Sequence, residues 1–296
     1  MENAAKEDGM NRRWWLYWLL VLLTLAAMLI SGCSSGGGTT GDSSEPYEEP
    51  DLSGVWLGDF SSNPKSNAVF AVGIIVPNED GYYAWYMADD RIYTSPASSP
   101  LSLSPNSAIF SGDLDEYSWT GIAPSYAASR ESLFMIGSAA TKGFMGVVGF
   151  PGGAYTYTTK DESGAFVFFY NTTYTVPPNV GNVGGSWEIA EGGVDGGTTI
   201  NLTITPSLTD TKGGSINGSD NRGNSFAGTI SIRYTPEPRN VYTVSMKLND
   251  TIDLTGLATY ILEMHTNGIS LPKKTLAIGA TSDDHTYSMS GLAKKK

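Results

Sequence analysis

Short runs of alternating apolar and polar residues, separated by turn-forming residues, fill the chain from Leu52 to its C-terminus. In residues 199–205 every second residue is Ile or Leu, and residues 229–234 and 242–248 follow the same pattern. Alternation with a period of two places one face of a strand in a core and the other toward water. Only residues 125–132 suggest a short helix. The pattern therefore predicts an all-β fold.

The first half of the chain carries runs that favour strands, although they alternate less regularly. These predicted strands cover residues 55–60, 68–76, 82–87, 108–114, 133–136, 144–150 and 165–174. The sequence Asn-Glu-Asp-Gly at residues 78–81 lies between two of them and predicts a hairpin turn. Glycine accounts for 35 of the 296 residues, which also favours tight turns between strands.

An internal repeat orders these strands. Gly54-Val55-Trp56 opens the first series and Gly185-Ser186-Trp187 opens the second. The further matches keep the same order along the chain: Ile109, Asp113, Trp119 and Gly121 with Ile216, Asp220, Phe226 and Gly228 at a constant offset of 107 residues, then Gly146 and Phe150 with Gly256 and Tyr260. Four landmarks in one order indicate a duplication.

The duplication predicts two tandem antiparallel up-and-down β-barrel-like domains of about eight strands each. Residues 52–178 would form the first domain and residues 179–296 the second, with the boundary in the Pro- and Gly-rich residues 176–184. Closure into a barrel would remove the exposed edge strands that a small open sheet presents.

The N-terminus has the organisation of a signal peptide, predicted to span residues 1–32. Arg12 and Arg13 precede an apolar run over residues 14–30 that only Thr24 interrupts. The run is marginal in length for a membrane span, which usually needs about 20 apolar residues. An uncleaved single-span anchor is the alternative, and the arginine pair also resembles a twin-arginine signal.

The exit of this run, Leu29-Ile30-Ser31-Gly32-Cys33, resembles the lipobox of bacterial lipoproteins. The resemblance implies cleavage before Cys33, a diacylglycerol on its thiol and an N-acyl chain such as palmitate, because two or more chains anchor a protein stably. Ser34, in place of an aspartate, implies sorting to the outer membrane, on either of its faces. Residues 33–51 are rich in Ser, Gly and acidic residues, which predicts a flexible tether.

Composition excludes several classes of partner and site. The formal net charge is −12, and the basic residues form no cluster except the three C-terminal lysines, so nucleic-acid binding is disfavoured. The partner that we expect is membrane lipid, because the predicted acyl chains on Cys33 would insert into it. Since Cys33 is the only cysteine and the anchor uses it, no thiol remains for a disulfide, a thiolate metal site or a nucleophile.

Two resemblances suggest a family. A Gly-x-Trp motif that opens a first strand, here ending at Trp56, resembles the calycin group of lipocalins and avidins, in which the tryptophan closes one end of the barrel.

The mature chain also resembles a group of two-repeat lipoproteins of Gram-negative bacteria that has no agreed activity. The residues carrying this second resemblance are Ile216, Gly218, Asp220, Gly223, Asn224, Phe226 and Gly228. Asn224 stands where a cysteine is common in that group, and Asn249 or Asp250 would stand at the position of its partner.

The sequence predicts no catalytic residue and no metal or cofactor other than the lipid. Its two histidines, His265 and His285, lie near turn-forming residues, and no Gly-x-Ser-x-Gly motif marks a nucleophile. Two histidines without spaced carboxylates do not make a catalytic zinc site. The acidic segments around Asp113 and Asp220 lack the terminal glutamate of a calcium loop, so we expect these two aspartates to be structural landmarks that cap turns.

Tyr83 and Trp85 project from one face of the strand predicted at residues 82–87, and Tyr82 and Tyr86 project from the other. One face would lie in a core. The face of Tyr83 and Trp85 could bind a small hydrophobic ligand, a glycan or an envelope protein. The alternative is that these residues are ordinary core and girdle aromatics of a small barrel.

We therefore expect a non-enzymatic outer-membrane lipoprotein of the cell envelope, with a binding or structural role. The alternative is a surface-exposed adhesin or a lipoprotein that binds host factors. A hydrolase is a third reading, and it would require His265 or His285 to face a pocket beside an oriented carboxylate.

Overall fold

The computed structural model of the chain describes residues 51–61, 69–88, 91–95, 100–104, 109–119, 126–139, 153–158, 163–189, 198–233, 237–262, 264–266, 269–271 and 274–296. The predicted signal peptide, Cys33 and the predicted tether up to residue 50 lie outside the described residues, as do Gly121, Gly146 and Phe150. Within the described ranges, no helix is long and apolar enough to cross a membrane.

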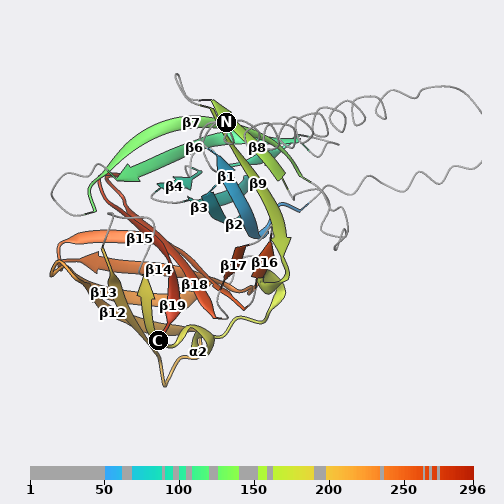
Figure 1. Ribbon diagram of the computed structural model, residues 1–296. Coiled ribbons are helices and arrows are strands. Elements are labelled where there is room, and N and C mark those ends of the chain that lie inside the picture. The colour runs from blue at the N-terminus through green and yellow to red at the C-terminus, as the bar shows by residue number, and fades with distance from the viewer. Residues whose placement is uncertain are drawn as a thin grey trace, which may run out of the picture. The chain divides into compact units, whose positions relative to one another are not determined.

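The first half of the structure is an antiparallel sheet that closes on itself (Figure 1). Its strands are β1 (Gly54–Ser61), β2 (Val69–Asn78), β3 (Gly81–Ala88), β4 (Arg91–Thr94), β5 (Ser102–Leu103), β6 (Ile109–Trp119), β7 (Ala128–Ala139), β8 (Gly153–Thr158) and β9 (Ser163–Asn171). Each strand pairs with its neighbour in sequence except at β5, because β4 pairs directly with β6. β1 pairs with β9, so the sheet forms a ring of eight strands with β5 added along β6.

The second half is a closed eight-stranded barrel with the same up-and-down order. It contains β10 (Gly185–Ile189), β11 (Ile200–Pro206), β12 (Gly213–Asp220), β13 (Ser225–Ile232), β14 (Val241–Leu248), β15 (Ile252–Ile261), β18 (Thr275–Ser282) and β19 (Ser288–Lys295). A separate hairpin of β16 (Met264–Thr266) and β17 (Ile269–Leu271) lies in sequence between β15 and β18. The all-β, two-domain prediction is thus confirmed.

A short connector joins the first ring to the second barrel. It consists of the 3-10 helix η1 (Thr172–Thr175) and the helical turn α2 (Val180–Val183). Asn171 is the N-cap residue of η1 and Asn179 is that of α2, and the side chain of each accepts a hydrogen bond from the backbone N–H two residues later. The Pro- and Gly-rich segment marked as the boundary in the sequence lies in this connector.

Each ring encloses its own apolar core, and a tryptophan of its first strand enters that core. Trp56 packs inside the first ring and Trp187 inside the second barrel, each no more than 1 % exposed. The indole Nε1–H of Trp56 donates to the Leu52 carbonyl at 3.0 Å, and that of Trp187 donates to the Val183 carbonyl at 2.7 Å. Both rings therefore begin with the same local arrangement, a buried indole bonded four residues back.

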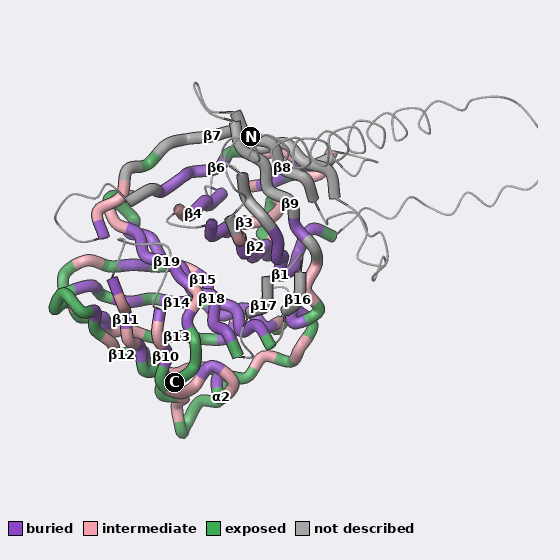
Figure 2. The backbone as a smooth tube through the Cα atoms, in the orientation of Figure 1, coloured by how far each residue is buried: buried purple, intermediate pink, exposed green. Residues whose placement is uncertain are grey.

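A third apolar cluster, which we call the interface cluster, joins the outer faces of the two rings. It combines Val55, Leu57, Val72, Ile74, Val76, Trp85, Met87, Ile92 and Tyr117 of the first ring, Tyr174 of η1, and Val241, Leu257, Ile261 and Ala277 of the second barrel. Because strands at this contact are covered on both faces, β18 is buried at every position, as its continuous colour in Figure 2 shows. By contrast, β14 keeps the alternation of a strand with one wet face.

Two predictions from the sequence are wrong. Within the predicted helix at residues 125–132, the described residues 126–132 form a turn and the beginning of β7, because β7 pairs with β6 from Ala128 to Ser138. The constant offset of 107 residues also does not relate equivalent positions of the two rings. Asp113 lies within β6, the fifth strand of the first ring, whereas Asp220 ends β12, the third strand of the second barrel. The two aspartates therefore do not occupy equivalent positions.

Candidate functional site at the interface of the rings

Tyr83 and Trp85 lie on the outer face of β3, on the same side of the strand, with ring centroids 6.4 Å apart. Trp85 is only 1 % exposed and belongs to the interface cluster. A Cβ placed on Gly279 of β18 would lie 2.5 Å from the indole Nε1 of Trp85, so the absence of a side chain at Gly279 admits the ring. The second barrel thus covers most of the face that the sequence suggested for an external ligand.

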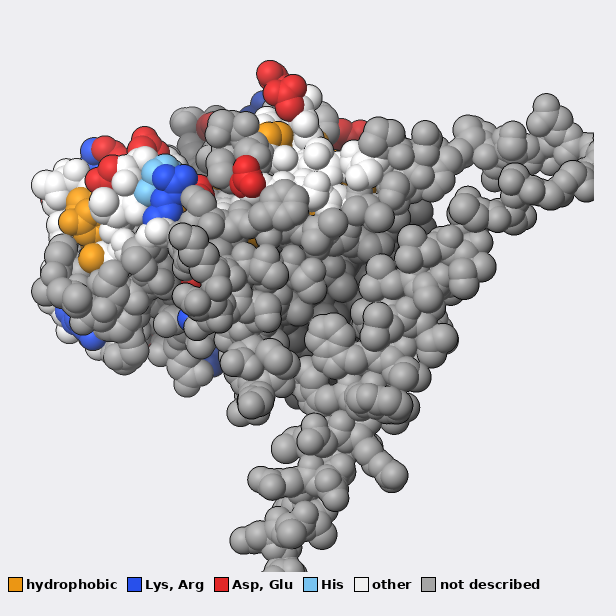
Figure 3. Space-filling view, turned by 90° about the horizontal axis from the view of Figure 1, so that it is seen from above, with side chains coloured by type: hydrophobic (Ala, Val, Ile, Leu, Met, Phe, Trp, Pro, Cys, Tyr) orange, Lys and Arg blue, Asp and Glu red, His pale blue; other side chains and the backbone are white. Residues whose placement is uncertain are grey.

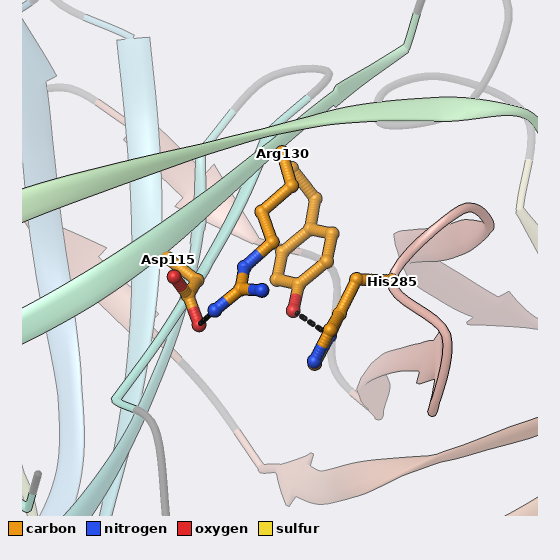
Figure 4. Close-up of polar contacts among 4 residues, drawn as sticks. Asp115, Arg130 and His285 are labelled. Carbon is orange, nitrogen blue, oxygen red and sulfur yellow. Dashed lines mark hydrogen bonds and ion pairs between the residues drawn. The ribbon is translucent and has the colours of Figure 1, made fainter.

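Polar side chains gather beside the interface cluster where β6 and β7 meet the turn between β18 and β19 (Figure 4). Asp115 is 2 % exposed, and its Oδ2 accepts from Nη2 of Arg130 at 2.9 Å. The Tyr117 hydroxyl contacts Nδ1 of His285 at 2.5 Å across the two rings. The outer edge of this group reaches the surface, where Figure 3 shows a histidine beside basic and acidic side chains.

The electrostatics of this group favour a structural role. Burial, followed by the charge of Asp115, raises the pKa of Tyr117 to about 12, so the phenol stays neutral at physiological pH. A neutral phenol can donate its proton to Nδ1 of a neutral imidazole. Asp284 caps its own turn, accepting from the Ser282 hydroxyl and the Thr286 backbone N–H. The arrangement links the rings, and within the described residues the ring of His285 bonds to the Tyr117 hydroxyl and to no serine hydroxyl.

The second contact between the rings centres on Asp220. Tyr126, which precedes β7, is 1 % exposed and lies in the core of the second barrel, edge-on to Phe226 with centroids 5.4 Å apart. Its hydroxyl donates to Oδ2 of Asp220 at 2.7 Å. The neighbouring backbone continues the contact, because the N–H of Ala128 donates to the Thr286 carbonyl at 2.8 Å. A residue of the first ring therefore completes the core of the second barrel.

Asp220 also caps the turn between β12 and β13, the role expected from its sequence. Its Oδ1 accepts from the backbone N–H groups of Arg222 at 2.9 Å and Asn224 at 2.8 Å. Burial alone would raise the pKa of Asp220, but hydrogen bonds from Asn224, Tyr126 and Arg222 outweigh it, and the pKa is lowered. Asp113, in contrast, is exposed in the middle of β6.

Asn224 and Asn249 lie side by side at one end of the β13 and β14 pair. The Asn249 amide donates to Oδ1 of Asn224 at 2.9 Å, and its own Oδ1 accepts the backbone N–H of Ser225. Asn249 adopts a φ of 53°, a left-handed conformation that asparagine tolerates. Asn224 stands where a cysteine is common in the group that the sequence resembles, and Asn249 is one of the two residues, with Asp250, that could stand at the position of its partner.

Within the described residues, no three His, Cys, Asp or Glu side chains are grouped closely enough to hold a metal ion. His285 is described in full, whereas the side chain of His265 on β16 lies outside the described residues. Comparisons of the chain with protein-family models, curated proteins and solved structures gave no significant match.

Sequence reasoning missed Tyr126, Arg233 and Arg239 as residues of the interface. Tyr126 carries no motif, and only the tertiary structure shows that it enters the other ring. The two arginines did have a signal, because they flank a short Pro-containing segment in a chain with only 18 Lys and Arg residues. Arginines at both ends of a turn bring two cations together when the turn closes.

Proposed function

We propose that this protein is a lipid-anchored protein of the cell envelope that acts by binding and not by catalysis, through the surface of a rigid body of two fused rings. The observation that supports this best is the interface cluster, which joins the outer faces of both rings into one apolar core. The interior of the second barrel is filled by side chains, among them its own Trp187, Phe226 and Tyr242 and, from the first ring, Tyr126. A filled barrel favours recognition at the surface over enclosure of a ligand.

The location in this proposal rests on the N-terminal sequence. Cleavage before Cys33, with a diacylglycerol on its thiol and an acyl chain on its new amine, would hold the protein on the outer membrane. The acidic tether would then separate the two rings from the lipid surface.

The test is a pair of variants in the full chain. In Cys33→Ala we expect loss of the acylated N-terminus by mass spectrometry and loss of the protein from the outer-membrane fraction. Ser35→Ala, a small change two residues away, should leave both readouts as in the unaltered protein. A Cys33→Ala protein with an unchanged N-terminus and unchanged fractionation would overturn the anchor.

A further inference from the structure

A small pocket opens at the edge of the interface cluster, beside the connection between β13 and β14. Its lining combines apolar and charged groups: Val76, Tyr174, Arg233, Glu237, Arg239 and Val241. Val76 belongs to the first ring and Tyr174 to η1, whereas the remaining residues belong to the second barrel. The pocket therefore exists only when the two rings are packed together.

The backbone around the pocket is held by Asn240, which is fully buried. Its side-chain amide donates to the carbonyls of Thr173 at 3.0 Å and Tyr260 at 2.5 Å, and its backbone N–H donates to the Tyr174 carbonyl at 3.2 Å. The backbone N–H of Arg233 donates to the Val241 carbonyl at 3.0 Å. These bonds hold the backbone at Arg233 and beside Arg239.

The two arginines have different surroundings. The Arg239 guanidinium lies 5.8 Å from the centroid of the Tyr174 ring and pairs with Glu237 at 2.6 Å. The Nε of Arg233 is buried, and within the described part of the chain it has no hydrogen-bond partner. Burial lowers the pKa of Arg233, and its electrostatic neighbours are the phenols of Tyr83 and Tyr174. A buried charged donor without an acceptor is costly, which points to an oxyanion as its partner.

We propose that this pocket binds the carboxylate of a ligand that carries a small apolar group. Two arginines and one glutamate leave the lining with a single net positive charge, which matches a monoanion better than a phosphate dianion. The planar guanidinium presents its N–H donors in a geometry suited to a carboxylate. Val76, Val241 and the Tyr174 ring form the apolar part of the lining, and the group that bears the carboxylate would lie at the opening of the pocket. The ligand is either a free carboxylic acid or the C-terminus of a polypeptide.

The first test uses the full chain in detergent and records the Nε–Hε resonance of Arg233 by NMR. Isobutyrate should move this resonance, whereas isobutyramide, which has the same shape without the charge, should leave it in place. A short peptide ending in valine, as the free acid and as the amide, then distinguishes a polypeptide C-terminus from a small acid. A resonance that ignores isobutyrate, or that responds only to inorganic phosphate, would overturn the proposal.

The second test uses variants. Arg233→Gln should weaken isobutyrate binding about tenfold or more, because it removes a charge-assisted hydrogen bond. Arg222→Gln makes the same change in the β12–β13 turn and should bind as the unaltered protein does. Equal affinity in both variants would contradict the assignment to Arg233.

This inference names the ligand class of the proposed binding role, and so it rests on that proposal. The measurements on the detergent-solubilised chain do not depend on acylation of Cys33. A failed anchor experiment and a failed carboxylate experiment are therefore separate outcomes.

Discussion

At the scale of single residues, the positions that resemble the two-repeat lipoprotein group build one hairpin, β12 and β13. Ile216 and Phe226 point into the core of the second barrel, and Asp220 caps the turn between the strands. Gly223 in that turn has a φ of 92°, which favours glycine. A Cβ on Gly228 would lie 2.0 Å from the Ser245 carbonyl of the neighbouring strand. The pattern is thus explained by the packing of a hairpin.

Asp220 makes stability depend on pH. Its folded-state pKa lies below the unfolded value of about 3.9. A depressed pKa contributes stability that is present above the unfolded value and is lost as the pH falls through the folded value. We expect Asp220→Asn to lose about 1–3 kcal/mol at neutral pH, because one carboxylate oxygen that accepts from Tyr126 or Asn224 becomes an amide donor.

Urea unfolding of both proteins at neutral pH and near pH 3 measures this effect. The difference between the unaltered protein and Asp220→Asn should shrink at the acidic pH. Asp253→Asn is the control, since its exposed pair with Lys247 should contribute about 1 kcal/mol at most. A difference that stays constant with pH would argue against a role for the ionised Asp220.

The residue-level predictions succeeded where a residue's role is local and failed where it depends on alignment. Turn capping by Asp220 needs only neighbouring N–H groups, and the two tryptophans each follow a turn and enter a core. The match of Asp113 to Asp220 aligned the sequence of a single eleven-residue strand, β6, with the sequence of the β12–β13 hairpin. Identical spacing in sequence does not imply the same position in a ring.

At the scale of elements, the period of each strand reports which of its faces are buried. β14 alternates, so its outer face lies in water. β18 is buried throughout because it lies between a core and the interface cluster. The regularly alternating strands of the second series, such as β14, were therefore predictable from the sequence, whereas β18 was not predicted. The continuous apolar runs carried further information, namely that these strands meet another surface, but not which one.

Tyr126 precedes β7 of the first ring, and its side chain occupies part of the core of the second barrel. Tyr126→Ala should cost about 3–5 kcal/mol, because it leaves a cavity against Phe226 and removes a donor to Asp220. Addition of 4-methylphenol should then raise the melting temperature of Tyr126→Ala, since the free phenol can occupy the cavity and donate to Asp220.

Two comparisons sharpen this experiment. Toluene fills the same space without a hydroxyl and should stabilise Tyr126→Ala less than 4-methylphenol does. Tyr126→Phe keeps the ring and should lose only the hydrogen bond, about 1.5–3 kcal/mol for a bond to a charged acceptor. If 4-methylphenol raises the melting temperature of the unaltered protein equally, the effect does not arise at the cavity.

At the scale of the whole described body, the interface cluster packs the two rings into one compact unit. Trp85, Val72 and Ile74 come from the first ring, and Leu257 and Ala277 come from the second barrel. Polar contacts across the same interface, such as Tyr117 with His285, add specificity. The sequence predicted two rings but did not decide whether the aromatic face of β3 packs or binds a partner, because nothing local reveals a contact that lies almost two hundred residues away in the chain.

Gly279 allows this interface to be tested with a single substitution. Its Cβ position lies 2.5 Å from Trp85 Nε1, so Gly279→Val should force the rings apart at a cost of about 1–3 kcal/mol. We expect the unaltered protein to unfold in urea as one transition when followed by tryptophan fluorescence and by circular dichroism. In Gly279→Val the two signals should separate, because each ring loses the support of the other.

Gly213→Ala is the control, since its added Cβ would lie 3.6 Å from the nearest atom. Coincident transitions in Gly279→Val, at the midpoint of the unaltered protein, would contradict the close packing of Trp85 against Gly279.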